Sequence, residues 1–214
     1  MKFILSIASV LFILSSCSTT PPPTPQNNST VTICNQVWMT KNLDVTTYRN
    51  GDAIPQVSDG AQWGNLTTGA WCYYNNDAAN GSIYGKLYNW YAVNDSRGLA
   101  PSGYHVPSDA EWTTLESCLG GSVTAGGAMK EAGLINWLSP NTGATNSSGF
   151  KCLPGGVRDS VGMFISIGKV GVFWSSTEDN SIYAFYRYLY YNVINIGRSS
   201  TNKPVGFSVR CIRD

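Results

Sequence analysis

Side chains that could carry acid–base chemistry are few in this chain. His105 is the single histidine, and Asp109 and Glu111 follow it closely. A general base needs a nucleophile or an orienting carboxylate beside it, and no GxSxG motif accompanies His105. Asp109 and Glu111 could act as a glycosidase-type pair, but residues two apart on a helix point in different directions. We predict that His105 bonds to loop backbone and that the protein has no catalytic residue.

Two oxygen-rich stretches could hold a calcium ion. They run from Asn75 to Asp77 and from Glu178 to Asn180, and calcium takes about six to eight oxygen ligands. Neither stretch has EF-hand spacing or the Glu-Pro-Asn and Trp-Asn-Asp motifs of calcium-dependent lectins. We interpret both as solvated turns, and no Cys/His spacing indicates zinc. We predict no cofactor, with calcium as the alternative.

The segment AFYRYLYYNV, residues 184–193, is the strongest candidate for ligand binding. On a strand its side chains would alternate between two faces. One face would carry Ala184, Tyr186, Tyr188 and Tyr190, and the other Phe185, Arg187, Leu189, Tyr191 and Val193. We expect the second face to be buried. Arg187 would then need a carboxylate or carbonyl partners, because an unpaired buried charge is costly.

Tyrosine rings suit a sugar ligand. A Tyr or Trp ring can cover the apolar face of a pyranose while Asn, Asp and Arg bond its polar edges. Antiparallel sheets also favour Tyr and Trp for packing, so each ring has a structural alternative. The predicted ligand contacts are Tyr186, Tyr188, Tyr190, Trp71, Tyr73, Asn75 and Asp77.

The elements that must position these residues are short. The 214 residues are 43% hydrophobic and 13% charged, and from Val31 onward short apolar runs alternate with Gly, Asn, Pro and Ser clusters. This pattern favours short strands and loops. A helix is predicted from Ser108, whose capping box with Glu111 precedes Trp112, Leu115 and Leu119 at helical spacing. A second, shorter helix is expected around residues 128–132.

The N-terminal segment indicates export and anchoring. Lys2, the apolar stretch 3–14 and the sequence Leu14-Ser15-Ser16-Cys17 resemble a bacterial lipoprotein signal. We expect a signal peptide over 1–16, lipidation of Cys17, a Pro-, Ser- and Thr-rich tether over 17–30 and one domain over 31–214. Ser18 and the absence of an acidic cluster favour the outer membrane, with either face possible.

Charge and cysteine content limit the possible partners. Removing residues 1–16 takes away Lys2 and leaves equal numbers of basic and acidic residues. No basic stripe is visible, so nucleic acid is not an expected partner. With Cys17 lipidated, an odd number of cysteines remains for disulfides, and the sequence leaves their pairing open. They are Cys34, Cys72, Cys118, Cys152 and Cys211.

Eight sequence blocks resemble a known family. In order they are VWMTKNLDVTTYRNGDAIP, YGKLYNWYAVND, GYHVPSDAEWTTLE, PNTGATNSSGF, LPGGVRDSVGMF, FWSSTE, YRYLYYNVINIGRS and GFSVRCIRD. Together they resemble the Fibrobacter succinogenes major paralogous domain over Val31 to Asp214.

A weaker similarity concerns the fold. GYHVPSDAEW and GFSVRC are similar to the frame of formylglycine-generating enzymes. This similarity implies an α+β, C-type-lectin-like fold of twisted antiparallel strands, two short helices and long loops. Those enzymes bind copper with a cysteine pair before the final strand. Residues 186–206 contain no Cys here, so the similarity does not imply their activity.

Three functions fit the sequence. The preferred one is a membrane-anchored, non-enzymatic binding or adhesion domain for polysaccharide or another cell-envelope or extracellular ligand. An enzyme on the same frame, with an unrecognised site, would place His105 in a cleft beside carboxylates. A purely structural envelope protein would bury every aromatic ring.

Overall fold

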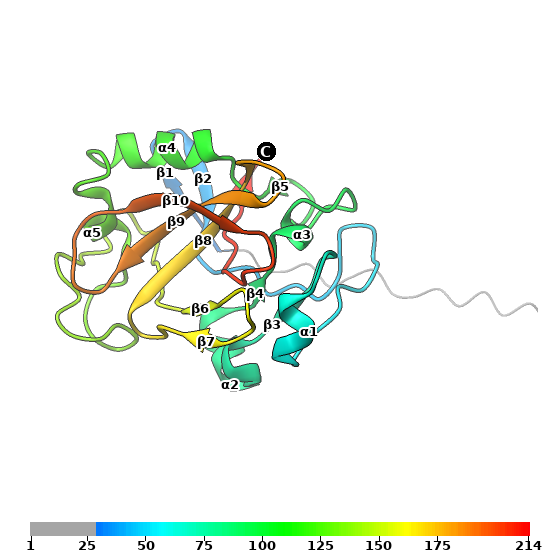
Figure 1. Ribbon diagram of the computed structural model, residues 1–214. Helices are drawn as coiled ribbons and strands as arrows, with labels where there is room; N and C mark the ends of the chain where they lie inside the picture. Colours follow the sequence, from blue (N-terminus) through cyan, green and yellow to red (C-terminus); the bar gives the residue numbers. More distant parts are fainter. Residues whose placement is uncertain (1–28) are drawn as a thin grey trace, which may run out of the picture.

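A computed structural model describes residues 29–214 (Figure 1). Residues 1–28 lie outside that range, including Cys17 and most of the predicted tether. Eleven strands are present: β1 (Thr30–Ile33), β2 (Gln36–Met39), β3 (Trp71–Cys72), β4 (Leu87–Tyr88), β5 (Tyr104–His105), β6 (Val157–Arg158), β7 (Phe164–Ile165), β8 (Val170–Glu178), β9 (Tyr183–Tyr190), β10 (Gly197–Asn202) and β11 (Ile212–Arg213). The helices are α1 (Gly60–Gly64), the 3-10 helix η1 (Tyr74–Asn76), α2 (Ala78–Tyr84), α3 (Trp90–Val93), α4 (Asp109–Cys118) and α5 (Ala125–Met129).

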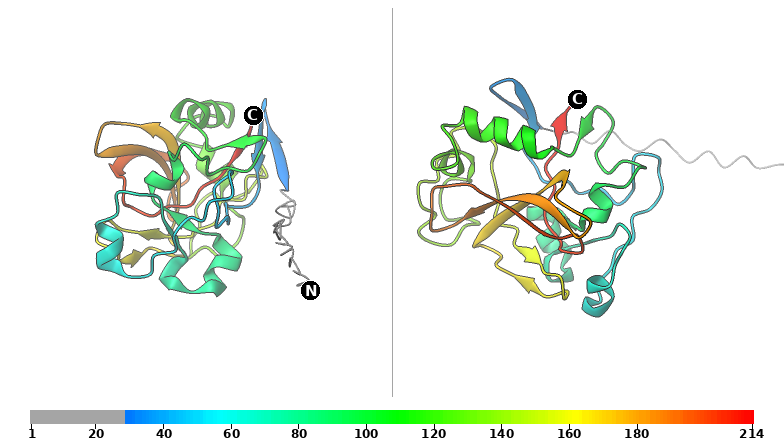
Figure 2. Two further views of the ribbon diagram at one scale, coloured as in Figure 1. Left: turned by 90° about the vertical axis from the view of Figure 1, so that its right-hand side faces the viewer. Right: turned by 45° about the horizontal axis from the view of Figure 1, so that its top comes forward.

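The strands form several small antiparallel sheets. The largest has the order β1-β2-β11-β5, and a second has the order β10-β9-β8. Pairs β3–β4 and β6–β7 make two further sheets. Pairing of β11 with β2 brings the C-terminus beside the first hairpin (Figure 2). The mixed architecture with long loops confirms the coarse expectation, although five short α-helices are present instead of two. Within residues 29–214, none of these helices has the length and apolar character needed to span a membrane.

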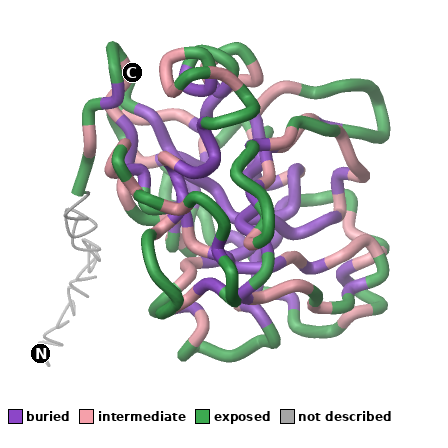
Figure 3. Tube along the Cα trace, turned by 90° about the vertical axis from the view of Figure 1, so that its left-hand side faces the viewer, coloured by how far each residue is buried: buried purple, intermediate pink, exposed green. Residues whose placement is uncertain are grey.

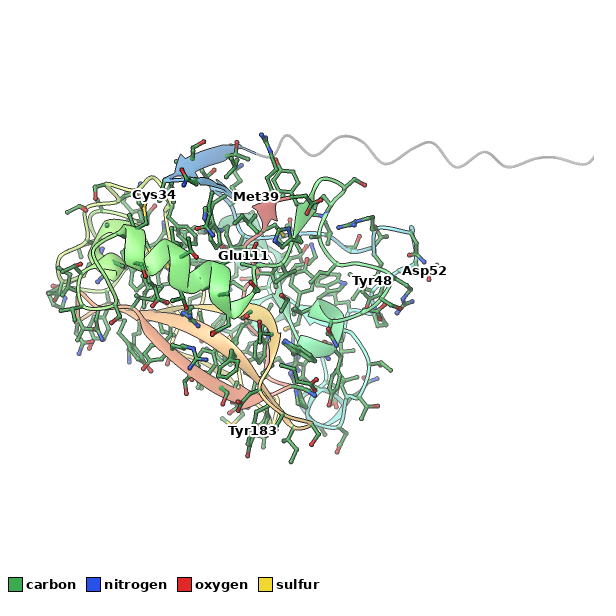
Figure 4. All side chains as sticks on the ribbon, turned by 90° about the horizontal axis from the view of Figure 1, so that it is seen from above. Cys34, Met39, Tyr48, Asp52, Glu111 and Tyr183 are labelled. Atoms are coloured by element: carbon green, nitrogen blue, oxygen red, sulfur yellow. A yellow bond between two sulfur atoms is a disulfide. The ribbon has the colours of Figure 1, made fainter. Side chains whose placement is uncertain are left out.

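Helix α4 lies across one face of the β10-β9-β8 sheet (Figures 1 and 4). Its predicted capping box is confirmed: the Glu111 backbone N–H donates to Ser108 Oγ at 3.3 Å, and the Ser108 N–H donates to Glu111 Oε2 at 2.7 Å. Trp112 and Leu115 of the predicted stripe are fully buried, whereas Leu119, the C-cap residue, is only half-buried. The second helix begins three residues earlier than expected, at Ala125, and ends at Met129. It ends there because Lys130 is extended and pairs with Cys152.

The core consists of three apolar clusters enclosed by exposed loops (Figure 3). The cluster beneath α4 is aromatic: the ring centroids of Trp112 lie 4.8 Å from Trp38 and 5.7 Å from Phe173. A second cluster lies on the other side of the β8–β9 pair and includes Trp174 and Phe207. Both faces of the β10-β9-β8 sheet are therefore packed against apolar clusters, and a ligand can reach this sheet only where that cover is incomplete.

One disulfide joins two distant segments. Cys34, in the turn between β1 and β2, is bonded to Cys118 at the end of α4 (Figure 4). Cys72, Cys152 and Cys211 are buried free thiols. Burial raises the pKa of Cys72 to about 11 and those of Cys152 and Cys211 to about 12. These thiols therefore remain protonated at neutral pH and are poor nucleophiles.

Candidate functional site

The sheet face opposite α4 carries the predicted tyrosines in one row. Directly paired residues of antiparallel strands share a face. Tyr188 pairs with Val172 of β8 and with Gly197 of β10, and Tyr186 pairs with Ser199. The resulting surface consists of Val170, Val172 and Trp174 from β8, Tyr186, Tyr188 and Tyr190 from β9, and Gly197, Ser199 and Thr201 from β10.

The β6–β7 hairpin forms a second wall against this surface (Figure 1). Arg158 fixes the hairpin, since its fully buried guanidinium donates to the carbonyls of Val57 at 2.5 Å and Ser58 at 2.7 Å. The same group lies 4.4 Å from the centre of the Trp63 ring. Because Arg158 holds the hairpin from behind, the side chains of Val157, Asp159 and Ile165 line the opposite side.

A cleft of about 390 Å³ lies between the two walls. This volume falls within the usual range of small-ligand sites, about 300–1,000 Å³. The lining residues are Val157, Asp159, Ser160, Ile165, Ser166, Val170, Val172, Tyr186, Tyr188, Tyr190, Ser199, Thr201, Val205 and Phe207. Aliphatic and aromatic surfaces thus alternate with hydroxyl groups, a combination that can contact both the apolar faces and the hydroxyls of a sugar.

The three tyrosines run from the interior to the surface. Tyr186 is half-buried and packs on Phe207, with ring centroids 4.9 Å apart. The centroid of Tyr188 lies 5.8 Å from that of Tyr186 and 5.5 Å from that of Tyr190. Tyr190 is 44% exposed. A tyrosine hydroxyl is neutral at pH 7 and can both donate and accept a hydrogen bond, and burial raises the pKa of Tyr186 further.

Gly197 positions the Tyr188 side chain of the cleft, and sequence reasoning missed it. A Cβ at Gly197 would lie 2.0 Å from Cζ of Tyr188, so only glycine lets the Tyr188 ring lie across β10. Such an aromatic residue opposite a strand glycine also shields the glycine backbone. The available sequence signal was the alternation of Gly197, Ser199 and Thr201, three small residues on the strand that follows the tyrosines.

A comparison with known families decides the classification. A family model described as Fibrobacter succinogenes major domain matches residues 31–213. The chain belongs to this family. No curated protein and no solved structure matches it. In this Fibrobacter succinogenes major domain, the segments LPGGVRDSVGMF and YRYLYYNVINIGRS, which carried part of the resemblance, supply much of the two cleft walls.

The other predicted ligand contacts of the domain do not line this cleft. Trp71 is 5% exposed, and its indole N–H donates to the carbonyl of Ile54. Tyr73 packs beside it, and the Lys86 ammonium lies over both rings. Asn75 lies in η1 with a φ of 54°, while the Asp77 carboxylate caps α2 by accepting from the Ala79 N–H. Local packing thus accounts for Trp71 and Tyr73 and capping for Asp77, while Asn75 is exposed in a left-handed backbone conformation.

The carboxylates in the two stretches considered for calcium already bond other groups of the protein. Asp77 is the α2 cap described above. In the second stretch, Glu178 forms an ion pair with Lys203, and Asp179 accepts a hydrogen bond from the Ser200 hydroxyl at 2.9 Å. Among residues 29–214, no three His, Cys, Asp or Glu side chains gather closely enough to hold a metal ion.

The face of β9 toward α4 follows the prediction only in part. Leu189 and Arg187 are fully buried, and Phe185 is half-buried beneath the Arg198 guanidinium, 4.0 Å away. The expectation for Val193 was wrong, because this side chain is 37% exposed. β9 ends at Tyr190, and the chain then turns. The strand alternation that would bury Val193 stops before reaching it.

His105 contacts two carboxylates, which corrects the prediction of a backbone bond. Its Nδ1 lies 2.7 Å from Asp214 Oδ1 and its Nε2 lies 2.8 Å from Glu111 Oε1. Burial lowers the pKa of His105, but the hydrogen bonds to Asp214 and Glu111 outweigh it and raise the pKa. With both ring nitrogens occupied, His105 ties the last residue to the start of α4. It does not line the tyrosine cleft.

Proposed function

We propose that this protein is an envelope lipoprotein whose domain binds polysaccharide in the tyrosine cleft. The observation that carries the proposal is the row of Tyr186, Tyr188 and Tyr190 along one wall of a 390 Å³ cleft. Neighbouring ring centroids are 5.8 and 5.5 Å apart, so successive rings could contact successive sugar units. The hydroxyls of Ser199 and Thr201 beside them could bond the sugar edges.

Two alternatives find less support. A purely structural protein was expected to bury every aromatic ring, whereas Tyr183 is 39% and Tyr190 is 44% exposed. An enzyme was expected to show His105 beside carboxylates in a cleft. The carboxylates are present, but they engage both ring nitrogens, and the tyrosine cleft lies elsewhere. A C-type-lectin-like frame remains part of the proposal; the short helices, small antiparallel sheets and long loops are compatible with it.

Substitutions on the two faces of β9 should have different effects: one on the cleft face should weaken binding, and one on the α4 face should lower stability. Tyr188→Ala is expected to weaken glycan binding about thirtyfold, equivalent to about 2 kcal/mol for a central aromatic contact. Leu189→Ala is expected to lower the free energy of unfolding by about 2–5 kcal/mol, because Leu189 is fully buried. A glycan array probed with the full chain in detergent would identify the ligand. Titration calorimetry and urea unfolding would then compare the variants.

Tyr183→Ala is the matched control. Tyr183 is an exposed tyrosine on the same strand (Figure 4) but does not line the cleft, so its loss should leave binding unchanged. Equal losses of affinity in Tyr183→Ala and Tyr188→Ala would show that the cleft is not the site. Equal destabilisation by Tyr188→Ala and Leu189→Ala would show that the tyrosine row only packs the sheet.

The proposed anchor has its own test. Cys17→Ala removes the thiol that would be lipidated, so the protein is expected to move from the detergent phase to the aqueous phase in Triton X-114 partitioning. A lipidated protein carries acyl chains that each contribute about 0.8 kcal/mol per buried methylene. Cys34→Ala serves as the control, because Cys34 is bonded to Cys118 inside the domain. Retention of Cys17→Ala in the detergent phase would exclude Cys17 as the anchor.

A further inference from the structure

The residues that line the cleft carry negative charge only. Asp159 is the single charged side chain among the described residues that line it. The nearby arginines point elsewhere. Arg158, although adjacent in sequence, is fully buried and donates to Val57, Ser58 and Gly162 carbonyls. Arg187 and Arg198 lie on the α4 side of the sheet, where both bond Asp109. The residues that line the cleft therefore present one anion and no cation to a ligand.

Asp159 is held in place by the hairpin turn. Its Oδ1 accepts the backbone N–H groups of Val161 at 3.0 Å and Met163 at 2.8 Å. Its own N–H donates to the Met163 carbonyl at 2.8 Å. No donor within residues 29–214 bonds Oδ2. The carboxylate thus has a fixed position and one oxygen that is free to face a ligand.

We propose that Asp159 makes the cleft select against acidic glycans. This inference rests on the proposed polysaccharide binding and adds the ligand class, a neutral or basic sugar chain without carboxylate or sulfate groups. The physical reason is like-charge repulsion at short range, with no compensating cation among the lining residues. A hydroxyl or an ammonium group beside Oδ2 gains a hydrogen bond at the same position.

Matched pairs of oligosaccharides test the inference. The probes are gluco-, galacto- and manno-oligosaccharides, each paired with the uronic acid oligomer of the same linkage and length. We expect the full chain in detergent to bind the neutral member of any bound pair at least tenfold more tightly. Raising the salt from about 0.01 M to 1 M should narrow this ratio, because the Debye length falls from about 30 Å to 3 Å.

Asp159→Asn assigns the selectivity to this side chain. Asparagine keeps an Oδ1 that can accept both turn N–H groups, but it removes the negative charge. The neutral-to-acidic affinity ratio is expected to fall at least tenfold in Asp159→Asn, and a melting-temperature measurement confirms that the hairpin is intact. As a control, Asp179→Asn removes a charge outside the cleft and should keep the wild-type ratio.

The outcomes are distinguishable. Wild-type protein that binds acidic members as tightly as neutral ones, or an Asp159→Asn ratio equal to that of the wild type, overturns the selectivity by Asp159. If neither member of any pair binds, the proposed glycan binding fails, and the selectivity fails with it.

Discussion

Trp112→Ala is expected to lower the free energy of unfolding by about 3–5 kcal/mol. Trp112 is fully buried, with 0% of its side chain accessible to water. Its ring contacts Trp38, Phe150 and Phe173 with centroid distances of 4.8, 5.9 and 5.7 Å. These partners lie on β2, on a loop and on β8. Alanine would leave a cavity where three separate parts of the chain meet, so the loss cannot be absorbed by a shift of one loop.

Urea unfolding measures this loss, with three companion variants in α4 and at its N-cap. Ser108→Ala removes only the cap and should cost about 1 kcal/mol. Trp112→Phe keeps a ring and removes an indole N–H that has no hydrogen-bond partner within residues 29–214, so it should cost much less than alanine. Thr114 lies on the exposed face of α4, so Thr114→Ala should change the free energy of unfolding little. If Trp112→Ala were neutral, α4 would not be part of the core.

The features that the sequence predicted are local ones. The α4 capping box depends on residues three apart, and the separation of Tyr188 from Leu189 depends on strand alternation. Both are determined within one element and are present in the structure. Val193 was misplaced because alternation holds only as far as the strand extends, and nothing in the tyrosine-rich segment marks Tyr190 as its end. The Cys34–Cys118 bond joins residues 84 positions apart, and local patterns carry no information on such a pairing.

In the candidate site, too, the part set by local spacing could be predicted and the part set by long-range contacts could not. One wall, the tyrosine row, follows from period-two spacing. The second wall is a hairpin of two-residue strands, too short for any periodicity to reveal. Its position depends on the buried Arg158, which binds carbonyls about a hundred residues earlier in the chain. Trp71 and Asp77 were proposed as ligand contacts because an aromatic or acidic residue has the same local signal whether it binds a ligand, packs in the core or caps a helix.

Arg187→Met is expected to lower the free energy of unfolding by about 3–5 kcal/mol at neutral pH. Arg187 is fully buried and pairs with Glu116, which is also buried. It donates further to Asp109 Oδ1 at 2.6 Å and to Thr113 Oγ1 at 3.0 Å. Methionine fills a similar volume but leaves the Glu116 carboxylate buried without its cation. The Asp109 carboxylate is destabilised less, because it keeps its ion pair with Arg198.

A double-mutant cycle attributes the loss to the unpaired charge. Arg187→Met/Glu116→Leu removes both members, and replacing a buried ion pair by apolar residues is often neutral or stabilising. The double variant should therefore be more stable than Arg187→Met alone. Urea unfolding of the four proteins gives the coupling free energy. If the double variant were as unstable as the sum of the single ones, the packing of Arg187, and not its charge pairing, would stabilise the sheet.

The pH dependence supplies an independent check on the same residue. Burial raises the pKa of Asp109, but the hydrogen bonds from Arg198 and Arg187 outweigh it and lower the pKa below its ordinary value. A carboxyl group with a lowered folded-state pKa stabilises the protein above its unfolded pKa, about 3.9, and loses this contribution as the pH falls through the folded-state pKa. Arg187→Met weakens that contribution, so its deficit relative to the wild type should be largest at pH 7 and should shrink at about pH 3. A deficit that is the same at both pH values would indicate that the carboxylates facing Arg187 do not account for its contribution to stability.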